Sequence, residues 1–524
     1  MNWSSIRTFA DVIRQASECY AGKIAFRDRH RELSFSAYEA EVNRLADALK
    51  SNGVQLGARV AVYSQGRIEV AVILGLCSAG FIPVPLNWRM PAAEISALLK
   101  DCDPSVLFVE DRYVASMTTV SGLSSECAVV CIGENVRGLD NYDDLLEEAG
   151  DQAFVPVQIL PEDPACMIYT SGTTGRPKGA LLTHRGVVLN CRESCHEAIK
   201  FDIDDVTLMV MPLFHVGGVW YYLFPSFASG CLTLIRERFD LDDVVATCVQ
   251  EAVTVIHVVP TMLAEILAHR DFTAAAALLR LIVYAGSSMP LDLLQRAMDQ
   301  LTGCGFAQAY GSTEGGIISA LDPASHYAAL ASPVAAQVLR SCGKPLSDTQ
   351  VIIDRPDMDS QDPIGEILVK SSRIMGAYWQ LPEATSERLD QGWLKTGDLG
   401  YFDADGYLYI VDRKNDMVIS GGENIYPFEV EEVLRSHPAV LEVSVFGLPD
   451  PKWVERLVAA VVMAPKTGIS EQALIEHVRQ YLPGYKTPKT IFFTEALPKN
   501  PVGKVLRKIL REKYLEPAAV VGRM

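Results

Sequence analysis

The chain has 524 residues, of which 49% are hydrophobic and 21% are charged, as in an ordinary globular protein. That length allows large cores and predicts at least two domains. A formal net charge of -18 excludes the basic surface typical of general nucleic-acid binders, although a local cradle can still hold a nucleotide.

The N-terminal segment carries no apolar secretory leader, and the longest uncharged apolar stretch, residues 70–86, is too short for a membrane span. We read it as a buried helix over residues 70–79 that leads into a strand over residues 81–84. Twelve cysteines are scattered without a C-x-x-C pair, which favours reduced thiols. We therefore expect a cytoplasmic protein without a transmembrane segment.

The first two thirds of the chain alternates apolar runs with amphipathic helical patterns, which predicts mostly parallel sheets covered by helices. A capping box from Ser36 to Glu39 is expected to open an early helix. Cys191, Cys195 and His196 lie close together on a predicted helix, where packing is favoured over metal binding. Predicted strands cover residues 60–63, 106–109, 129–132, 208–211, 232–235, 253–256 and 281–284, and predicted helices cover residues 262–269 and 291–301.

The pattern becomes rich in strands after about residue 341. Strands are expected at residues 351–353 and 366–369, followed by a hairpin that turns at residues 403–406. A compact α+β pattern follows, with helices at residues 427–436 and 471–481, the second capped by Ser470, and strands at residues 443–446 and 458–462. We predict an α/β protein whose residues 1–413 form a large N-terminal domain of helix-covered sheets plus a β-rich subdomain. Residues 414–524 are expected to form a small mobile α+β domain.

The segment over residues 169–179 concentrates four hydroxyl residues and three glycines ahead of and around Lys178, directly after an apolar run read as a buried strand. Glycines let the backbone approach a ligand closely, and backbone N–H groups with hydroxyls can cradle phosphate oxygens. The segment is not a Walker A loop, because Gly179 stands where that loop needs Ser or Thr.

This segment resembles the phosphate-binding signature of the adenylate-forming superfamily, which includes acyl-CoA synthetases, peptide-synthetase adenylation domains and beetle luciferases. Four further segments match that superfamily in the expected order, at residues 211–215, 309–314, 396–398 and 498–507, so the resemblance covers nearly the whole chain. It implies an ATP-dependent carboxylic acid–CoA ligase that uses ATP, Mg²⁺ and coenzyme A. The acid would first become an acyl-adenylate and then a thioester.

The resemblance implies a nucleotide site made of several segments. Glu314 would hold Mg²⁺, Tyr310 would lie against adenine, and Asp398 with Arg413 would contact the ribose. Lys504 is implied to be the catalytic lysine of adenylate formation, and Thr170 and His215 are also expected in the catalytic set. The remaining ATP or AMP contacts are expected from Ser171, Gly172, Thr173, Thr174, Gly175, Lys178, Gly286, Ser287, Ser288, Ala309, Gly311 and Thr313.

The resemblance also implies an acid pocket and a coenzyme A channel. The pocket residues are expected to be Phe214, His215, Gly217, Gly218, Gln308, Gly311 and Gly315. The channel residues are expected to be Ser420, Gly421, Gly422 and Trp453. The C-terminal domain of the superfamily rotates between the two steps about a hinge that here is Asn415, where the familiar pattern has Asp or Lys.

Three alternatives stay open at this point: an adenylation enzyme that loads a carrier protein, a luciferase-like oxygenase, and a nucleotide-binding relative without catalysis. An amino-acid substrate is disfavoured because no Asp follows Phe214, where amino-acid-activating relatives hold one. We expect an aromatic or a medium- to long-chain aliphatic monocarboxylic acid, with Trp220, Tyr221 and Tyr222 near its pocket. The expected partners are this small acid, ATP and coenzyme A, with no nucleic acid, and the resemblance is compatible with a homodimer.

Overall fold

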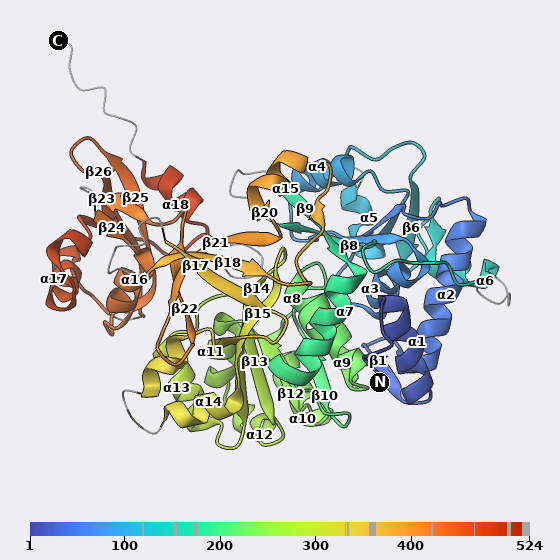
Figure 1. Ribbon diagram of the computed structural model, residues 1–524, viewed down its shortest axis with the longest axis horizontal. Helices are drawn as coiled ribbons and strands as arrows, with labels where there is room; N and C mark the ends of the chain where they lie inside the picture. Colours follow the sequence, from blue (N-terminus) through green and yellow to red (C-terminus); the bar gives the residue numbers. More distant parts are fainter. Residues whose placement is uncertain are drawn as a thin grey trace, which may run out of the picture. The chain divides into compact units, whose positions relative to one another are not determined.

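The computed structural model of the chain divides into two compact units (Figure 1). The first comprises Met1–Val351 and Val369–Leu394, and the second comprises Ile352–Leu368 and Lys395–Met524. The structure describes residues 1–117, 120–149, 155–170, 177–330, 332, 335–355, 363–420, 423–465, 467–499 and 505–515. The predicted domains, residues 1–413 and 414–524, were divided at an expected hinge, and that division stays a prediction.

The first unit is built on a nine-stranded sheet in the order β16-β15-β14-β13-β12-β10-β11-β1-β2. Neighbours from β1 to β14 in this order are parallel, while β2, β15 and β16 are antiparallel additions at the two edges. The strands are β1 (Ile24–Arg27), β2 (Glu32–Ser34), β10 (Val206–Met209), β11 (Leu232–Ile235), β12 (Val255–Val258), β13 (Leu281–Ala285), β14 (Gly305–Ser312), β15 (Gly316–Leu321) and β16 (Lys344–Pro345).

Two smaller sheets complete the first unit. An all-parallel sheet has the order β4-β3-β5-β6-β7, and an antiparallel sheet has the order β19-β9-β8. Their strands are β3 (Arg59–Tyr63), β4 (Ile82–Pro85), β5 (Val106–Glu110), β6 (Ala128–Ile132), β7 (Asp140–Asn141), β8 (Pro164–Thr170), β9 (Lys178–Thr183) and β19 (Ala377–Tyr378).

Helices cover both faces of the nine-stranded sheet. Figure 1 shows α10 to α14 next to β10, β12 and β13. The core between these helices and the sheet contains Ile256, Ile282 and Leu294, and the core on the opposite face of the sheet contains Val255, Val283 and Trp220. The helices are α1 (Phe9–Tyr20), α2 (Phe35–Ser51), α3 (Ile68–Gly75), η1 (Leu76–Ala79), α4 (Ala92–Cys102), α5 (Asp111–Met117), α6 (Tyr142–Glu148), α7 (His184–Glu193), η2 (Ser194–Ala198), α8 (Val216–Gly218), η3 (Val219–Leu223), α9 (Phe224–Ala228), α10 (Leu241–Gln250), α11 (Pro260–Ala268), α12 (Phe272–Ala276), α13 (Leu291–Gln300), α14 (Pro323–Ala329), η4 (Ala335–Arg340) and α15 (Pro382–Arg388).

The chain passes between the units within the sheet ordered β17-β18-β21-β20, in which β22 also pairs with β21. The rest of the second unit is a sheet ordered β24-β23-β26-β25, with β27 beside β26. Its elements, with those of the connecting sheet, are β17 (Gln350–Asp354), β18 (Gly365–Lys370), β20 (Leu389–Asp390), β21 (Trp393–Phe402), β22 (Leu408–Arg413), β23 (Val418–Ser420), β24 (Glu423–Ile425), α16 (Pro427–Arg435), β25 (Val440–Asp450), β26 (Val454–Met463), α17 (Glu471–Tyr481), η5 (Gly484–Lys486), β27 (Thr490–Phe493) and α18 (Arg507–Tyr514).

The structure confirms the predicted α/β class and the mostly parallel sheets. Each of the seven strands predicted in the first two thirds lies within two residues of an observed strand, and the hairpin between β21 and β22 is present. Ser470 caps α17 as predicted, with its hydroxyl accepting from the N–H of Ala473. No helix in the described ranges is long and apolar enough to cross a membrane.

The predicted capping box at Ser36 is wrong. The helix α2 begins at Phe35, and its N-cap is Ser34, whose hydroxyl accepts from the N–H of Ala37 at 3.1 Å. Ser36 instead donates its hydroxyl to the carbonyl of Ala21 at 2.9 Å. Two serines separated by Phe35 offer two capping positions, and the pairing of β1 with β2 decides between them because Ser34 ends β2 opposite Ile24.

A buried ion cluster in the second unit joins β22 to α18. Arg507 contacts three carboxylates, with nitrogen–oxygen distances of 3.3 Å to Asp412, 2.9 Å to Asp416 and 2.8 Å to Glu431. Only 16% of the Arg507 side chain is exposed. Burial raises the pKa of Asp412 and Arg507 opposes that shift. The N–H of Phe428 donates a hydrogen bond to Oδ2 of Asp412. The segment just before Asn415 is therefore bound to both α16 and α18.

We expect Arg507→Met to destabilise the second unit by about 3–5 kcal/mol, because it leaves buried carboxylates without a cation. Hydrogen exchange at β22, α16 and α18 measures this loss as faster exchange. Lys508→Met is the matched control. The Lys508 side chain is next in sequence and 68% exposed, so this substitution should change stability by less than about 0.5 kcal/mol. Equal exchange rates in the two variants would contradict a structural role for the cluster.

Candidate functional site

Several predicted residues lie where parallel strands of the nine-stranded sheet end. Gly286, Ser287 and Ser288 follow β13 directly and are exposed, while Tyr310 is buried near the end of β14. The strand β14 bends at a bulge between Tyr310 and Gly311 before turning into β15. A Cβ at Gly311 would stand 2.2 Å from the carbonyl oxygen of Gly316, so this close turn requires glycine.

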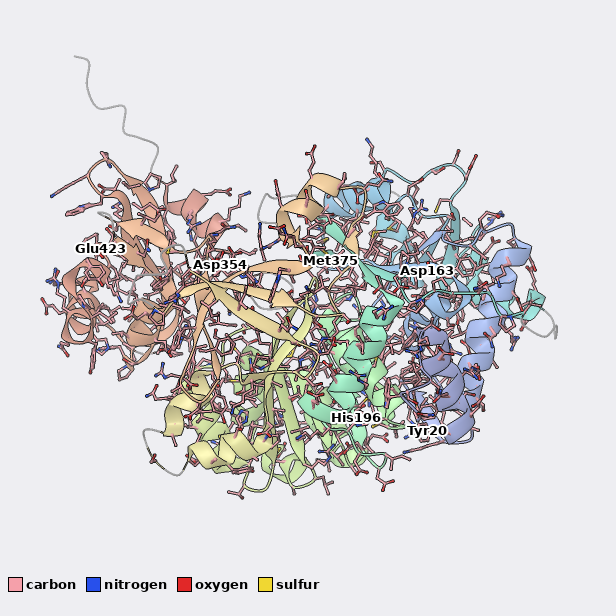
Figure 2. The ribbon with its side chains drawn as sticks, viewed as in Figure 1. Tyr20, Asp163, His196, Asp354, Met375 and Glu423 are labelled. Atoms are coloured by element: carbon pink, nitrogen blue, oxygen red, sulfur yellow. The ribbon has the colours of Figure 1, made fainter. Side chains whose placement is uncertain are left out.

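Glu314 lies on the turn between β14 and β15 and is held by a segment that sequence reasoning did not select. The Tyr378 hydroxyl donates to Oε1 of Glu314 at 2.7 Å, and the N–H of Met375 donates to the Glu314 carbonyl at 2.8 Å. Met375, labelled in Figure 2, is itself buried. Burial and the charge of Glu314 raise the pKa of Tyr378, so its hydroxyl keeps the proton that it donates.

Lys178 reaches the same tyrosine from the opposite strand of the small sheet. Its Nζ lies 5.2 Å from the centre of the Tyr378 ring, within the range of a cation–π contact. The strand β19 places this ring by pairing with β9, where Tyr378 faces Ala180. The structure therefore brings Glu314 and Lys178 together around Tyr378. The only local sequence signal for the role of Tyr378 was the pair of adjacent aromatic residues within residues 376–379.

The two ends of the predicted phosphate loop are held as a pair. Thr170 at the end of β8 lies opposite Lys178 at the start of β9, and the Thr170 hydroxyl donates to the Lys178 carbonyl at 3.5 Å. The apolar run before the segment is a strand, as predicted, and β8 pairs with β9 in antiparallel fashion. Ser171, Gly172, Thr173, Thr174 and Gly175 lie outside the described residues.

His215 begins α8 as its N-cap. Its Nδ1 accepts from the N–H of Gly217 at 3.1 Å, which places the proton of the neutral ring on Nε2. Burial lowers the pKa of His215 to about 4, so the ring is neutral at pH 7. A Cβ at Gly218 would lie 2.5 Å from the Pro212 carbonyl, which explains why glycine follows here. The ring of Phe214, the other predicted member, is edge-on to Trp88 at 6.3 Å.

Two tyrosines of the π-helix η3 fasten the His215 segment to the sheet. The Tyr221 hydroxyl donates to the Ser312 carbonyl at 2.6 Å, and the Tyr222 hydroxyl donates to the Val255 carbonyl at 2.8 Å. Tyr222 and Trp220 are almost fully buried, so they pack the segment from behind. Single π-turns in helical segments often occur at functional sites.

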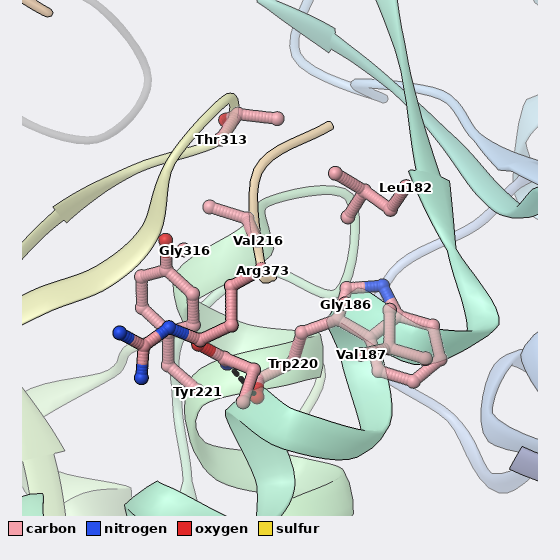
Figure 3. Close-up of a pocket in the computed structure, with 10 residues that line it drawn as sticks. Leu182, Gly186, Val187, Val216, Trp220, Tyr221, Thr313, Gly316 and Arg373 are labelled. Atoms are coloured by element: carbon pink, nitrogen blue, oxygen red, sulfur yellow. Dashed lines mark hydrogen bonds between the residues drawn. The ribbon is translucent and has the colours of Figure 1, made fainter. Parts of the chain in front are cut away.

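A cavity of about 10 Å³, large enough for about one water molecule, lies between α7, η3 and the β14–β15 turn. Figure 3 shows Thr313 at one end of it and Val216, Tyr221 and Arg373 along its walls. Thr313 is itself a predicted site residue and Val216 follows His215, so the cavity lies next to two predicted parts of the site. The remaining lining residues are Leu182, Gly186, Val187, Asn190, Trp220 and Gly316.

Two predicted pocket residues on β14 and its turn have different surroundings. Gly315 is buried, and its N–H donates to the Ser312 hydroxyl at 3.0 Å. Gln308 alternates with Ala307 and Ala309, so its side chain belongs to the opposite face of the sheet from those alanines. The structure thus does not bring Gln308 to the His215 face.

Within the second unit, the predicted ribose residues are paired across a hairpin. Asp398 on β21 lies opposite Arg413 on β22, with 3.4 Å between Oδ1 and Nε. The next residue, Lys414, contacts Glu366 at 2.7 Å and also donates its N–H to the Gly397 carbonyl. Asn415 follows directly, so this side of the predicted hinge is fixed to β21.

The predicted channel and lysine segments are described only in part. Ser420 is buried at the end of β23, and Trp453 is 38% exposed with Lys452 over its ring at 4.5 Å. Gly421, Gly422 and Lys504 lie outside the described residues. The ends of the Lys504 segment are paired, because Lys499 forms a bridge with Val505.

The alternative of a metal site at Cys191, Cys195 and His196 gains no support. His196, labelled in Figure 2, lies edge-on to Trp3 at 6.0 Å, and Cys191 and Cys195 are buried in the core. Among the described residues, no group of three His, Cys, Asp or Glu side chains could hold a metal ion. All twelve cysteines are free.

Comparison with known proteins agrees with this geometry. The family profile of the AMP-binding enzymes matches residues 13–379, and that of the AMP-binding enzyme C-terminal domain matches residues 429–504. The chain is 36% identical to indoleacetate–CoA ligase of Aromatoleum aromaticum over 94% of this chain and 95% of that protein. It is also 36% identical to feruloyl-CoA synthase of an Amycolatopsis species, over 94% and 96%.

A solved structure, o-succinylbenzoate CoA synthetase of Bacillus subtilis in complex with its acyl-adenylate intermediate, superposes with a TM-score of 0.81. That match has 30% identity and covers 95% of this chain and 97% of the other. The two family profiles together cover residues 13–379 and 429–504 of the chain. The chain belongs to the AMP-binding enzyme family, within the adenylate-forming superfamily that its motifs resemble.

Proposed function

We propose that this protein is an ATP-dependent carboxylic acid–CoA ligase. The single observation that supports this most is that the chain matches both parts of the AMP-binding family while its relatives are CoA ligases over almost their whole length. In the first step a carboxylate oxygen attacks the α-phosphorus of ATP, and the bond to pyrophosphate breaks. In the second step the sulfur of coenzyme A attacks the acyl carbon, and AMP leaves as the carbon–oxygen bond breaks.

Both steps need stabilised negative charge and alignment, and neither needs a protein nucleophile. Mg²⁺, when bound, would neutralise phosphate charge. It favours one or two carboxylates plus phosphate oxygens, and the half-buried Glu314, with one oxygen oriented by Tyr378, fits that preference. In this proposal Glu314 holds the metal, and Thr170, Thr313 and residues 171–178 contact phosphates.

The other roles follow the same chemistry. Tyr310 and residues 286–288 would contact adenine, Asp398 with Arg413 would accept and donate to the ribose hydroxyls, and Lys504 would bridge the acid carboxylate and the α-phosphate. The C-terminal domain, residues 414–524, would rotate about Asn415 between the steps. Ser420, Gly421, Gly422 and Trp453 would then line the channel for coenzyme A.

The neutral His215 would border the acid carboxylate, because an uncharged ring with its proton on Nε2 can donate to an anion without a permanent charge. Among the expected acids we favour an aromatic or arylalkyl acid, since indoleacetate and ferulate name the acids of the two relatives compared above.

We place the enzyme in the cytoplasm, where its twelve free cysteines would stay reduced. The proposal of a homodimer is supported only by the resemblance to the superfamily. Carrier-protein loading is the second candidate, because the chain is also 33% identical to a fatty acid–[acyl-carrier-protein] ligase of Streptomyces coeruleorubidus over 92% of each protein, and it becomes one outcome of the test below.

The function is tested with purified protein, Mg·ATP and a panel of aromatic and aliphatic acids, with and without coenzyme A. We expect pyrophosphate release that depends on the acid, and equal amounts of AMP and acyl-CoA by mass spectrometry. AMP with no thioester would favour carrier loading. An absence of AMP with every acid would sink the proposal and favour a non-catalytic role.

Lys504→Ala should reduce adenylate formation by about 10²–10³-fold or more, because one preorganised charge at the reacting phosphate is lost. The variant should still form thioester from supplied acyl-AMP, since that step does not use this lysine. Quenched-flow measurement of the separate half-reactions checks this, with the exposed Lys508→Ala as the control. Equal loss in both half-reactions would contradict the assignment.

Tyr378→Phe should lower kcat/KM for adenylation by about 10–100-fold and raise the Mg²⁺ concentration needed for half-maximal rate. The reason is that a hydrogen bond to a charged group contributes about 1.5–3 kcal/mol. Tyr327→Phe is the control, because its hydroxyl donates to the Cys304 carbonyl instead. If both variants keep the wild-type Mg²⁺ dependence, Tyr378 does not orient Glu314 for catalysis.

A further inference from the structure

His257 is a buried titratable residue that the proposed mechanism does not use. It lies on β12, is 3% exposed, and neither ring nitrogen has a hydrogen-bond partner among the described residues. No other histidine in the described part of the chain has both nitrogens buried and unpartnered. Burial lowers the pKa of His257 to about 4, so its neutral ring offers one donor and one acceptor.

The position of His257 connects it to the His215 segment. A Cβ at Gly217 would lie 3.7 Å from its Cε1, and the Tyr222 ring is centred 5.5 Å from the His257 ring. The sheet face around it carries small side chains. His257 faces Val283 on β13, Val283 faces Ala307 on β14, and the next row toward the strand ends pairs Ala285 with Ala309.

Two polar groups next to the His257 ring, Nδ1 of His215 and the Tyr222 hydroxyl, form hydrogen bonds elsewhere. Nδ1 of His215 accepts from Gly217, and the Tyr222 hydroxyl donates to the Val255 carbonyl. A buried donor and a buried acceptor without partners cost free energy. A ligand group that reaches this face would remove that cost, whereas a hydrocarbon chain would leave it in place.

We propose that His257 is a specificity-determining residue of the acid pocket. Its ring forms a hydrogen bond with a polar group carried on the body of the acid, such as a ring N–H or a ring hydroxyl. The next row toward the strand ends consists of the small side chains of Ala285 and Ala309. The substrate class is therefore an aryl or arylalkyl acid with a polar ring group. This inference rests on the proposed ligase function and narrows its substrate.

The test compares matched acids that differ in one polar group. The pairs are indole-3-acetate with benzothiophene-3-acetate, and 4-hydroxycinnamate with cinnamate. We expect wild-type kcat/KM for AMP formation to favour the polar member of at least one pair by about tenfold or more, because a site built for a hydrogen bond rejects the analogue that lacks it. His257→Phe should bring that ratio close to one while leaving the apolar member nearly unchanged.

Two further variants keep the test decisive. His257→Gln retains a donor and an acceptor and should keep part of the preference. His257→Leu, which has neither, replaces His257→Phe if that variant does not fold. Tyr222→Phe removes a neighbouring hydroxyl that is already paired and should keep the full ratio. A preference in the indole pair would indicate that His257 binds a ring N–H, and a preference in the cinnamate pair would indicate that it binds a ring hydroxyl.

Ratios near one in the wild type, or a ratio unchanged in His257→Phe, would overturn the inference while acid-dependent AMP formation still supported the ligase. No AMP from any acid, apolar members included, would instead overturn the proposed function.

Discussion

The hydrogen bond from Tyr378 to Glu314 is the contact around which the described part of the site is organised. It joins the β14–β15 turn to the three-stranded sheet, and the same ring carries the ammonium of Lys178 on its face. The protonated phenol of Tyr378 orients the Glu314 carboxylate without adding charge, which suits the metal-binding role that we propose for Glu314. The pKa of Tyr378 is raised by burial and by Glu314 itself, so the bond maintains the protonation state on which it depends.

The proposed acid side of the site consists of uncharged rings. His215 and His257 are both kept uncharged by burial, and a Cβ at Gly217 would lie 3.2 Å from Nδ1 of His215 and 3.7 Å from Cε1 of His257. Uncharged rings can approach an anion and a polar ring group without the desolvation cost of a permanent charge. The two histidines differ in what they already bind: His215 is fixed by the Gly217 N–H, while His257 remains unpaired among the described residues.

Local patterns were sufficient for much of the fold. Apolar runs fixed the positions of strands such as β11 and β13, and Ser470 was recognised as a cap because its partner, Ala473, is three residues away. Errors occurred where a distant partner decides. Ser34 rather than Ser36 caps α2 because β2 pairs with β1.

The sequence by itself determined which chemical groups are present and in what order, since the motifs around Thr170, Glu314 and Asp398 are each contiguous in the chain. Only the tertiary structure decided which groups meet. Tyr378 reaches Glu314 and Lys178, and His257 reaches Gly217, through sheet register and packing between segments far apart in the chain. The physical reason is that a local pattern fixes backbone conformation, whereas orientation and pKa depend on burial and on neighbours that the pattern does not contain.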